Sequence, residues 1–436
     1  MGRGSAMQAP RTPLAILLAV VAIAGAVAIG ANPPVTAAPT VSTTVVNLAV
    51  GDTALVTCAA QPIIVPEDGR IVVGCNPVPG APTDTATATS RPTTTTTTPS
   101  ATTTATAAPS TTPGRPAMGI LLAGADIRAL SITSTGWKAV KAAADAAWGS
   151  PNLSDLNNKH DVYTLAGALA YARTGDGGYR AKTAAAILAA IGTEDASRAL
   201  EISRNIQSYV FAADLINLRE YDAAGDQRFR SWLASVRSQS FDGMSIVQSS
   251  EKRPNNWGTH AMAARVAIAR YLGDSADLAR AAAVFKGWLG DRSSYAGYSY
   301  GDLSWQADPS KPVGINPKGA VKNGHNVDGV LPDDQRRAGS YTWPPPCENY
   351  VHEALQGALV AAWQLSRAGY DVWGWQDRAL LRAYQWLYTV DKCPASGDDG
   401  GYPWLINRAY GTTFAGASPA PMGKNLGFQD WLFGGK

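Results

Sequence analysis

The sequence is poor in charge, in histidine and in cysteine, and these shortages exclude some classes of function. Charged residues make up 16% of the 436 residues, the formal net charge is +3, and no basic run follows the chain. A nucleic-acid-binding protein needs a basic surface that follows the phosphates, so we expect no nucleic-acid partner. The four cysteines and four histidines show no CxxC or Cys/His spacing for zinc, so we expect no metal site.

A long apolar run lies near the N-terminus. Arg3 and Arg11 precede an uncharged run over residues 14–31, and small residues and prolines follow it. This order is typical of a secretory signal within residues 1–38, although the run also reaches the length that spans a bilayer. We therefore expect the rest of the chain to lie outside the cytoplasm, either secreted after cleavage of the signal or tethered to the membrane or cell wall by an uncleaved anchor.

The cysteines fall into two separate segments, which fits an oxidising compartment. Residues 41–80 alternate β-branched and small residues between turn signals, which predicts a small module of short strands. So small a module needs a disulfide, and Cys58 and Cys75 would supply it. We interpret this module as a spacer or a contact with the cell wall.

Two further segments complete the predicted domain organisation. Residues 81–116 are almost entirely Thr, Pro, Ala and Ser, too poor in apolar side chains to build a core. They predict an extended linker of the kind that carries O-linked glycans. Residues 117–436 then form the main domain.

The main domain is dominated by helical patterns that repeat in pairs. Each pair starts with an Ala- and Gly-rich helix that is nearly uncharged, and a helix with Arg or Lys on one face runs back. A buried inner helix and an amphipathic outer helix, repeated, predict an all-α domain of helical hairpins closed into an (α/α) toroid or incomplete barrel; an open solenoid is the alternative. The expected helices are 134–148, 160–174, 178–191, 200–220, 226–238, 256–271, 275–289, 348–368 and 374–389.

Polar residues gather at the starts of the inner helices, in LNNKHD (156–161), SRNIQSY (203–209), PNNWGTH (254–260) and CENYVHE (347–353). A single Asn at a helix start is usually a cap. Inner helices of a toroid start at the same end, however, so these residues would face one cavity, and three of the four histidines are among them. The substrate-binding candidates here are His160, Arg204, Asn205, Asn255, Trp257, Glu348 and His352.

Residues 290–347 have little regular pattern and are rich in aromatic residues, Gly and Pro. A long irregular segment inside a compact domain is usually functional. Tyr341 and Trp343 suit the faces of sugar rings, and Arg336 or Arg337 can clamp a carboxylate with two hydrogen bonds. Cys347 and Cys393 flank a helical hairpin at the same end, so we expect a disulfide that staples this segment to the scaffold.

At these motifs the sequence resembles the alginate lyase family of (α/α)-toroid polysaccharide lyases. NNWGTHAMAARVAIARYLGD, DGVLPDDQRR and ENYVHEALQGALVAAW carry the resemblance, which extends over roughly residues 120–390. It implies β-elimination on an anionic, uronate-containing polysaccharide without a cofactor. By position it implies Asn256 as the group that neutralises the carboxylate and Tyr350 as acid and base, with Arg337 assisting.

One departure from the family pattern concerns the residue after the Asn pair. Trp257 stands where the family has a His, and the nearest His is His260, one helical turn further. We therefore add His260 to the catalytic candidates, with His352 as the alternative. The departure leaves the identity of the uronate polymer open.

Two other functions remain open on the sequence. A glycoside hydrolase on the same scaffold would need paired carboxylates, for which the candidates are Asp302, Asp333, Asp334 and Glu348. A non-catalytic glycan- or wall-binding protein would also fit the leader, linker and aromatic loops. We favour the lyase because Asn, His, Arg and Tyr gather at the helix starts, and we expect a monomer.

Overall fold

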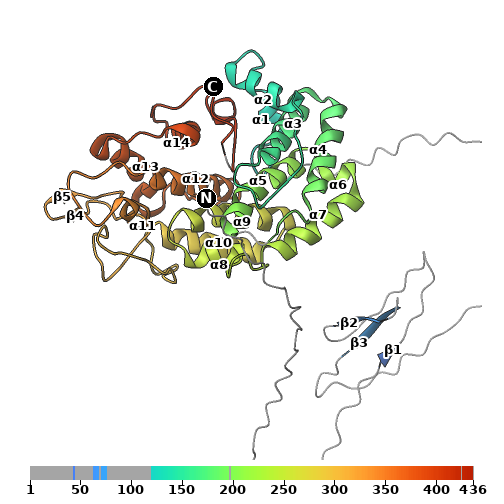
Figure 1. The fold of residues 1–436 in the computed structure, drawn as a ribbon, viewed down its shortest axis with the longest axis horizontal. Coiled ribbons are helices and arrows are strands. Elements are labelled where there is room, and N and C mark those ends of the chain that lie inside the picture. Colours follow the sequence, from blue (N-terminus) through green and yellow to red (C-terminus); the bar gives the residue numbers. More distant parts are fainter. Residues whose placement is uncertain are drawn as a thin grey trace, which may run out of the picture. The chain divides into compact units, whose positions relative to one another are not determined.

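The structure, a computed structural model, describes residues 43–44, 62–67, 70–75, 119–195, 198–423 and 425–435. The chain divides into two compact units, Met1–Thr106 and Ala107–Lys436 (Figure 1). The predicted signal, the Thr/Pro-rich linker and Cys58 lie outside the described residues. No helix among the described residues has both the length and the apolar character needed to cross a membrane.

The first unit contains a three-stranded antiparallel sheet in the order β1-β3-β2. The strands are β1 (Thr43–Thr44), β2 (Pro62–Glu67) and β3 (Arg70–Cys75). Glu67 pairs with Arg70, so β2 and β3 are adjacent antiparallel strands. The predicted strands within residues 41–80 are therefore present.

The second unit is predominantly helical, and the described residues contain few strands. Its elements are α1 (Gly124–Arg128), α2 (Thr135–Asp145), α3 (His160–Thr174), α4 (Gly177–Ala190), α5 (Ala199–Leu215), α6 (Leu218–Tyr221), α7 (Ala223–Val236), α8 (Ile246–Lys252), α9 (Asn256–Leu272), α10 (Ser275–Trp288), β4 (Val321–Lys322), β5 (His325–Asn326), α11 (Pro332–Gln335), η1 (Arg336–Ala338), α12 (Asn349–Arg367), α13 (Trp375–Trp386), η2 (Leu387–Asp391), η3 (Gly397–Gly401), α14 (Pro403–Tyr410) and α15 (Gln429–Phe433).

Helices α3, α5, α9 and α12 form the buried row of this unit. Each packs against the next, and every residue of α5 is buried. Their small residues allow this close packing. A Cβ on Gly357 of α12, for example, would lie 2.6 Å from the carbonyl oxygen of Thr259 in α9. Figure 1 shows the helices following one another around an arc from α2 and α3 to α13 and α14.

The return helices α4 and α10 pack against the buried helix that precedes each of them, and Gly-Asp makes both connections. Gly175 and Gly273 end α3 and α9 with φ of 77° and 70°, a left-handed conformation that glycine adopts without strain. The following Asp176 and Asp274 then accept hydrogen bonds from the first-turn N–H groups of α4 and α10. The dipeptide thus ends one helix and begins the next.

The C-terminal segment crosses the buried row and returns to the start of the unit. Asn425 is fully buried; its Nδ2 donates to Gln356 of α12, and its Oδ1 accepts from Gln207 of α5. The indole of Trp431 in α15 lies 5.2 Å from that of Trp137 in α2. The C-terminus therefore lies beside α1 and α2 (Figure 1).

Most expected helices are present within a few residues, and one expectation is corrected. The helix expected over 200–220 ends at Leu215, because Asn217 adopts a left-handed conformation with φ of 49° and α6 starts after it. Helices α8 and α14 were not expected from the sequence. Residues 290–347 are mainly irregular, as expected, and contain only β4, β5, α11 and η1 as named elements.

Candidate functional site

The start of α9 is held from two directions. Asn255 accepts a hydrogen bond from the N–H of Trp257 at 3.2 Å, so it is the cap of this helix. The N–H of Asn256 donates to Oδ1 of Asp334 at 3.0 Å, from the short helix α11. Asn256 is buried, and its side-chain Oδ1 accepts no hydrogen bond from the described residues. The two asparagines therefore have different roles, one as a cap and one with an uncommitted amide oxygen.

Asp333 and Asp334 have different partners, and only Asp333 holds an arginine of the pair that follows. Asp334 is fully enclosed, and burial raises the pKa of its carboxyl well above the usual range. Asp333 forms an ion pair with Arg336, with Nε and Oδ1 2.8 Å apart, and also accepts the N–H of Gly301. Arg336 is thereby committed within the loop, whereas Arg337 is exposed.

Arg337 lies over the aromatic ring of Tyr350. Its guanidinium carbon is 4.0 Å from the ring centroid, a cation–π contact. Tyr350 is 39% exposed, and its N–H donates to Glu348, the cap of α12, at 2.9 Å. Through α11 and η1, one loop therefore contacts both Asn256 and Tyr350.

A buried charged cluster connects α5, α9 and α12. Arg204 forms an ion pair with Glu353, and its Nε donates to Nε2 of His260 at 3.2 Å. Nε2 of His260 also lies 3.9 Å from the Glu353 carboxylate. Because Nε2 accepts from Arg204, the proton of a neutral His260 is assigned to Nδ1. Burial lowers the pKa of Arg204, while neighbouring carboxylates, including Asp399 and Glu201, raise it.

His260 and Asn256 lie four residues apart on the same face of α9, so the charged cluster adjoins the Asn256 turn. The side chain of His260 is fully buried. It contacts Arg204 rather than the surface, which suits a group that positions the arginine. Its predicted catalytic role stays a prediction.

Asp399, in η3, borders the same cluster. It is buried and accepts a hydrogen bond from Nε2 of Gln356 at 2.5 Å. Burial raises its pKa to about 6, against the lowering effects of hydrogen bonds from Gln356 and Asn349 and of the charge of Arg204. Nothing in the sequence near Asp399 indicated this contact, because it depends on the return of the chain after α13. Glu353, by contrast, was detectable three residues after Tyr350 on the same helical face.

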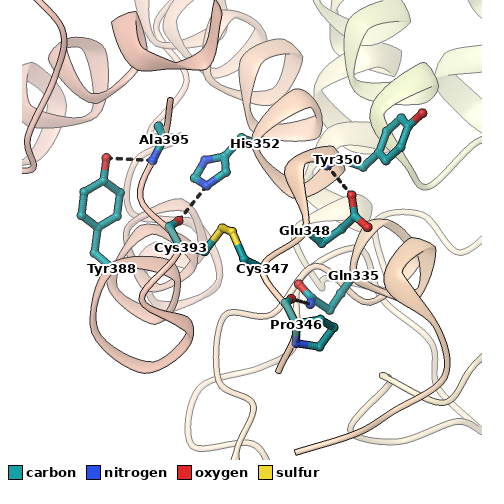
Figure 2. The surroundings of a disulfide bond; sticks show 9 residues. All are labelled: Gln335, Pro346, Cys347, Glu348, Tyr350, His352, Tyr388, Cys393 and Ala395. Carbon is teal, nitrogen blue, oxygen red and sulfur yellow. Dashed lines mark hydrogen bonds between the residues drawn. A yellow bond between two sulfur atoms is a disulfide. The ribbon is translucent and has the colours of Figure 1, made fainter. Parts of the chain in front are cut away.

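The other two candidate histidines lie against different partners. Nδ1 of His160 is 2.8 Å from the Tyr209 hydroxyl, and burial lowers the pKa of this imidazole to about 4. Nε2 of His352 is 2.9 Å from the carbonyl oxygen of Cys393. Figure 2 shows His352 and Tyr350 pointing to opposite sides of α12. The three histidines therefore have different hydrogen-bond partners, and substrate contact by His160 or His352 stays a prediction.

The expected disulfide between Cys347 and Cys393 is present, with the two Cα atoms 5.3 Å apart. It joins the residue before Glu348 to the segment that follows η2 (Figure 2). Nearby, Nε2 of Gln335 in α11 donates to the carbonyl oxygen of Pro346 at 2.8 Å. The loop that begins α12 is thus tied to both α11 and the end of the α12–α13 hairpin.

The remaining candidate residues each make separate contacts. Asn205 donates to the carbonyl groups of Leu153 and Asp155 and so holds the segment before α3. Tyr341 donates its hydroxyl to the Lys322 carbonyl. Trp343 stacks on His325, with the ring centroids 4.3 Å apart. Trp257 lies beside two arginines, Arg198 and Arg253.

One comparison with known proteins found a match, and it lies within the helical unit. Residues 149–300 match the family model described as alginate lyase, a stretch that includes α3 to α10 and therefore Asn256 and His260. Arg337 and Tyr350 lie beyond the matched stretch. No curated protein and no solved structure matches the chain. The family match implies a polysaccharide lyase acting on a polysaccharide substrate, and it agrees with the resemblance of the helical unit to the alginate lyase family.

Proposed function

We propose that the protein is an exported lyase that cleaves a uronate-containing polysaccharide by β-elimination. The observation that carries this proposal is the double attachment of one loop: Asp334 bonds the backbone of Asn256, and Arg337 lies over Tyr350. An amide, a guanidinium and an exposed phenol are thereby gathered at the adjoining starts of α9 and α12. The family match over residues 149–300 supports the same reaction class.

The chemistry assigns a separate task to each group. The amide of Asn256 and the guanidinium of Arg337 donate to the uronate carboxylate, where negative charge develops as the C5 proton leaves. Preorganised donors aimed at such charge typically supply about 3–4 kcal/mol each. Tyr350, acting as its phenolate beside the charge of Arg337, takes the C5 proton, the C4=C5 double bond forms, and the C4–O glycosidic bond breaks. The departing oxygen then receives a proton from the same phenol.

The buried cluster of Arg204, His260 and Glu353 supports this arrangement from behind. Glu353 is one helical turn from Tyr350, and His260 is one turn from Asn256. The contacts of Arg204 with both residues connect the two turns that carry the reacting groups. We therefore assign His260 to positioning rather than to proton transfer.

The proposal includes the wider organisation of the domain and its place outside the cytoplasm. The parallel row of α3, α5, α9 and α12, together with the contact of α15 with α2, supports an (α/α) toroid. The N-terminal apolar run supports export or anchoring, and the disulfide between Cys347 and Cys393 fits an oxidising compartment.

A glycoside hydrolase is a second candidate because of two carboxylates that the sequence did not single out. Glu353 pairs with Arg204, and the charge of Arg204 also acts on Asp399, whose pKa is raised to about 6. In glycoside hydrolases, a carboxyl with a raised pKa acts as the acid and an ionised carboxylate is its partner. The previously considered carboxylates are less suitable, since Asp333 is bonded to Arg336 and Glu348 caps α12.

Far-ultraviolet absorbance separates the two reactions. The purified protein is incubated with alginate, polyglucuronate and pectate, and both absorbance and new reducing ends are followed. A lyase creates a double bond conjugated to the carboxylate, which absorbs, whereas hydrolysis creates reducing ends alone. We expect absorbance that is lost in Tyr350→Phe and retained in Asp399→Asn. Reducing ends without absorbance, lost in Asp399→Asn, would replace the lyase with the hydrolase.

A further inference from the structure

Two guanidinium groups flank the indole of Trp257, the residue directly after Asn256. The guanidinium carbons of Arg198 and Arg253 lie 5.3 Å and 4.9 Å from a Trp257 ring centroid. Both are cation–π contacts, in which the indole is the strongest aromatic partner. Trp257 is half-buried. In this chain the residue after the Asn pair therefore contacts two arginine cations beside the proposed uronate site.

Arg253 has no carboxylate partner among residues 119–195, 198–423 and 425–435. Its Nε donates only to Sδ of Met244, at 3.5 Å, which is a weak acceptor. The nearest carboxylate in the sequence, Glu251, is already engaged by Arg265 and Arg280. A half-buried guanidinium with such poor compensation retains most of its capacity to bind an anion.

Arg198 differs from Arg253 because it already has a partner. It forms an ion pair with Glu201 while its side chain remains 45% exposed. Glu201 offsets most of the charge of Arg198, so Arg198 contributes less than Arg253 to the positive potential near Trp257. Arg253 is the stronger candidate for direct contact with an anionic ligand.

The backbone fixes Arg253 close to the reacting groups. Arg253 is the residue that ends α8, three positions before Asn256. At Gly258 in the first turn of α9, a Cβ would lie 3.2 Å from Cβ of Arg253 and would overlap its carbonyl group. Glycine there lets the end of α8 pack directly against α9, so the backbone of Arg253 is held against the first turn of α9 that carries Asn256.

We propose that Arg253, oriented by Trp257, binds the carboxylate of the sugar next to the uronate that is cleaved. This inference rests on the proposed lyase function and assigns to Arg253 the recognition of the neighbouring uronate. The planar guanidinium can bind a carboxylate through two parallel hydrogen bonds, which fixes the register of the polymer as well as its affinity. A polymer in which uronates alternate with neutral sugars would place no charge at Arg253.

Steady-state kinetics of Arg253→Met test the proposal. Methionine keeps an unbranched side chain against Met244 and Trp257 but removes the charge. The matched control is Arg228→Met, since Arg228 is exposed on α7 and has no ion pair among the described residues. Thermal unfolding of both variants, followed by circular dichroism, establishes that they are folded. The substrates are polyglucuronate or alginate, with contiguous uronates, and hyaluronan, in which uronates alternate with neutral sugars.

We expect wild-type protein to prefer the contiguous polymer. Arg253→Met should raise its KM about tenfold, the usual effect of losing one charge-assisted contact, with kcat changed less than about twofold. Arg228→Met should change neither constant. An unchanged KM in Arg253→Met, a loss confined to kcat, or equal turnover of hyaluronan by wild-type protein would overturn the proposal while leaving the lyase function intact.

Binding provides a readout that does not depend on turnover. If wild-type protein forms no double bond on any polymer, the proposed function fails, and calorimetry with an oligouronate then tests the subsite alone. Binding by wild-type protein that weakens about tenfold in Arg253→Met supports the subsite. Absence of binding, or equal binding by both proteins, refutes it.

Discussion

Replacement of Asp334 tests the link between the catalytic loop and Asn256. The Asp334 carboxyl is fully enclosed, and burial raises its pKa well above the usual range. What the N–H of Asn256 needs is an acceptor oxygen, not a charge. Asp334→Asn keeps that oxygen and the side-chain volume, so we expect its free energy of unfolding to stay within about 1 kcal/mol of wild type.

Asp334→Ala removes the acceptor and leaves a helix-terminal N–H buried without a partner. An unsatisfied buried donor costs about 1–3 kcal/mol, and loss of a helix cap costs a similar amount. These two descriptions overlap, so we expect a loss of about 2–3 kcal/mol in urea unfolding, measured at the midpoint with the slope unchanged. Asp126, exposed on α1, provides the control, and its Asn and Ala variants should stay within about 0.5 kcal/mol of wild type.

The pH dependence of stability gives the sign of the Asp334 effect. A carboxyl whose folded pKa lies above its unfolded pKa, near 3.9, stays protonated to a higher pH in the folded state than in the unfolded state. The free energy of unfolding of wild-type protein therefore falls as the pH rises from about 4 toward the raised folded pKa. Asp334→Asn does not titrate, so it should gain stability relative to wild type over that range. An Asn variant as unstable as Ala, or one that loses relative stability as pH rises, would refute a raised pKa of the Asp334 carboxyl.

Three further predictions concern the phenol, the disulfide and a buried imidazole. Tyr350→Phe should abolish double-bond formation, measured by absorbance, while leaving the unfolding midpoint unchanged, because the ring is 39% exposed and its hydroxyl holds no other element. Replacing Cys347 and Cys393 together by Ser should lower the free energy of unfolding by about 4 kcal/mol, the chain-entropy value for a separation of 46 residues; an unchanged urea midpoint would contradict this. The folded pKa of His160 is about 4, below its unfolded value of 6.5, so wild-type stability should fall as pH drops from about 6.5 to 4. His160→Gln should lack that fall, and an identical pH profile for the two proteins would show that the imidazole is not held neutral.

Local patterns in the sequence determined most of the helical scaffold. Helices α3, α9 and α12 begin and end within a few residues of the expected positions, because capping groups and the Gly-Asp connections act over one or two turns. The disulfide between Cys347 and Cys393 also followed from the hairpin, since its two ends must lie together. The break after Leu215 was missed, because a helix-compatible sequence gives no warning that Asn217 turns left-handed.

The tertiary structure alone decided how the polar residues divide their roles. The contact of Asp334 with Asn256 joins residues 78 positions apart, and the contact of Arg204 with His260 joins residues 56 apart. No local spacing encodes such pairs, because they depend on which helices become neighbours. The same packing set the Arg337 guanidinium over the Tyr350 ring and His260 against Arg204. The sequence thus named the residue types of the site, and the packing of helices determined which of them meet.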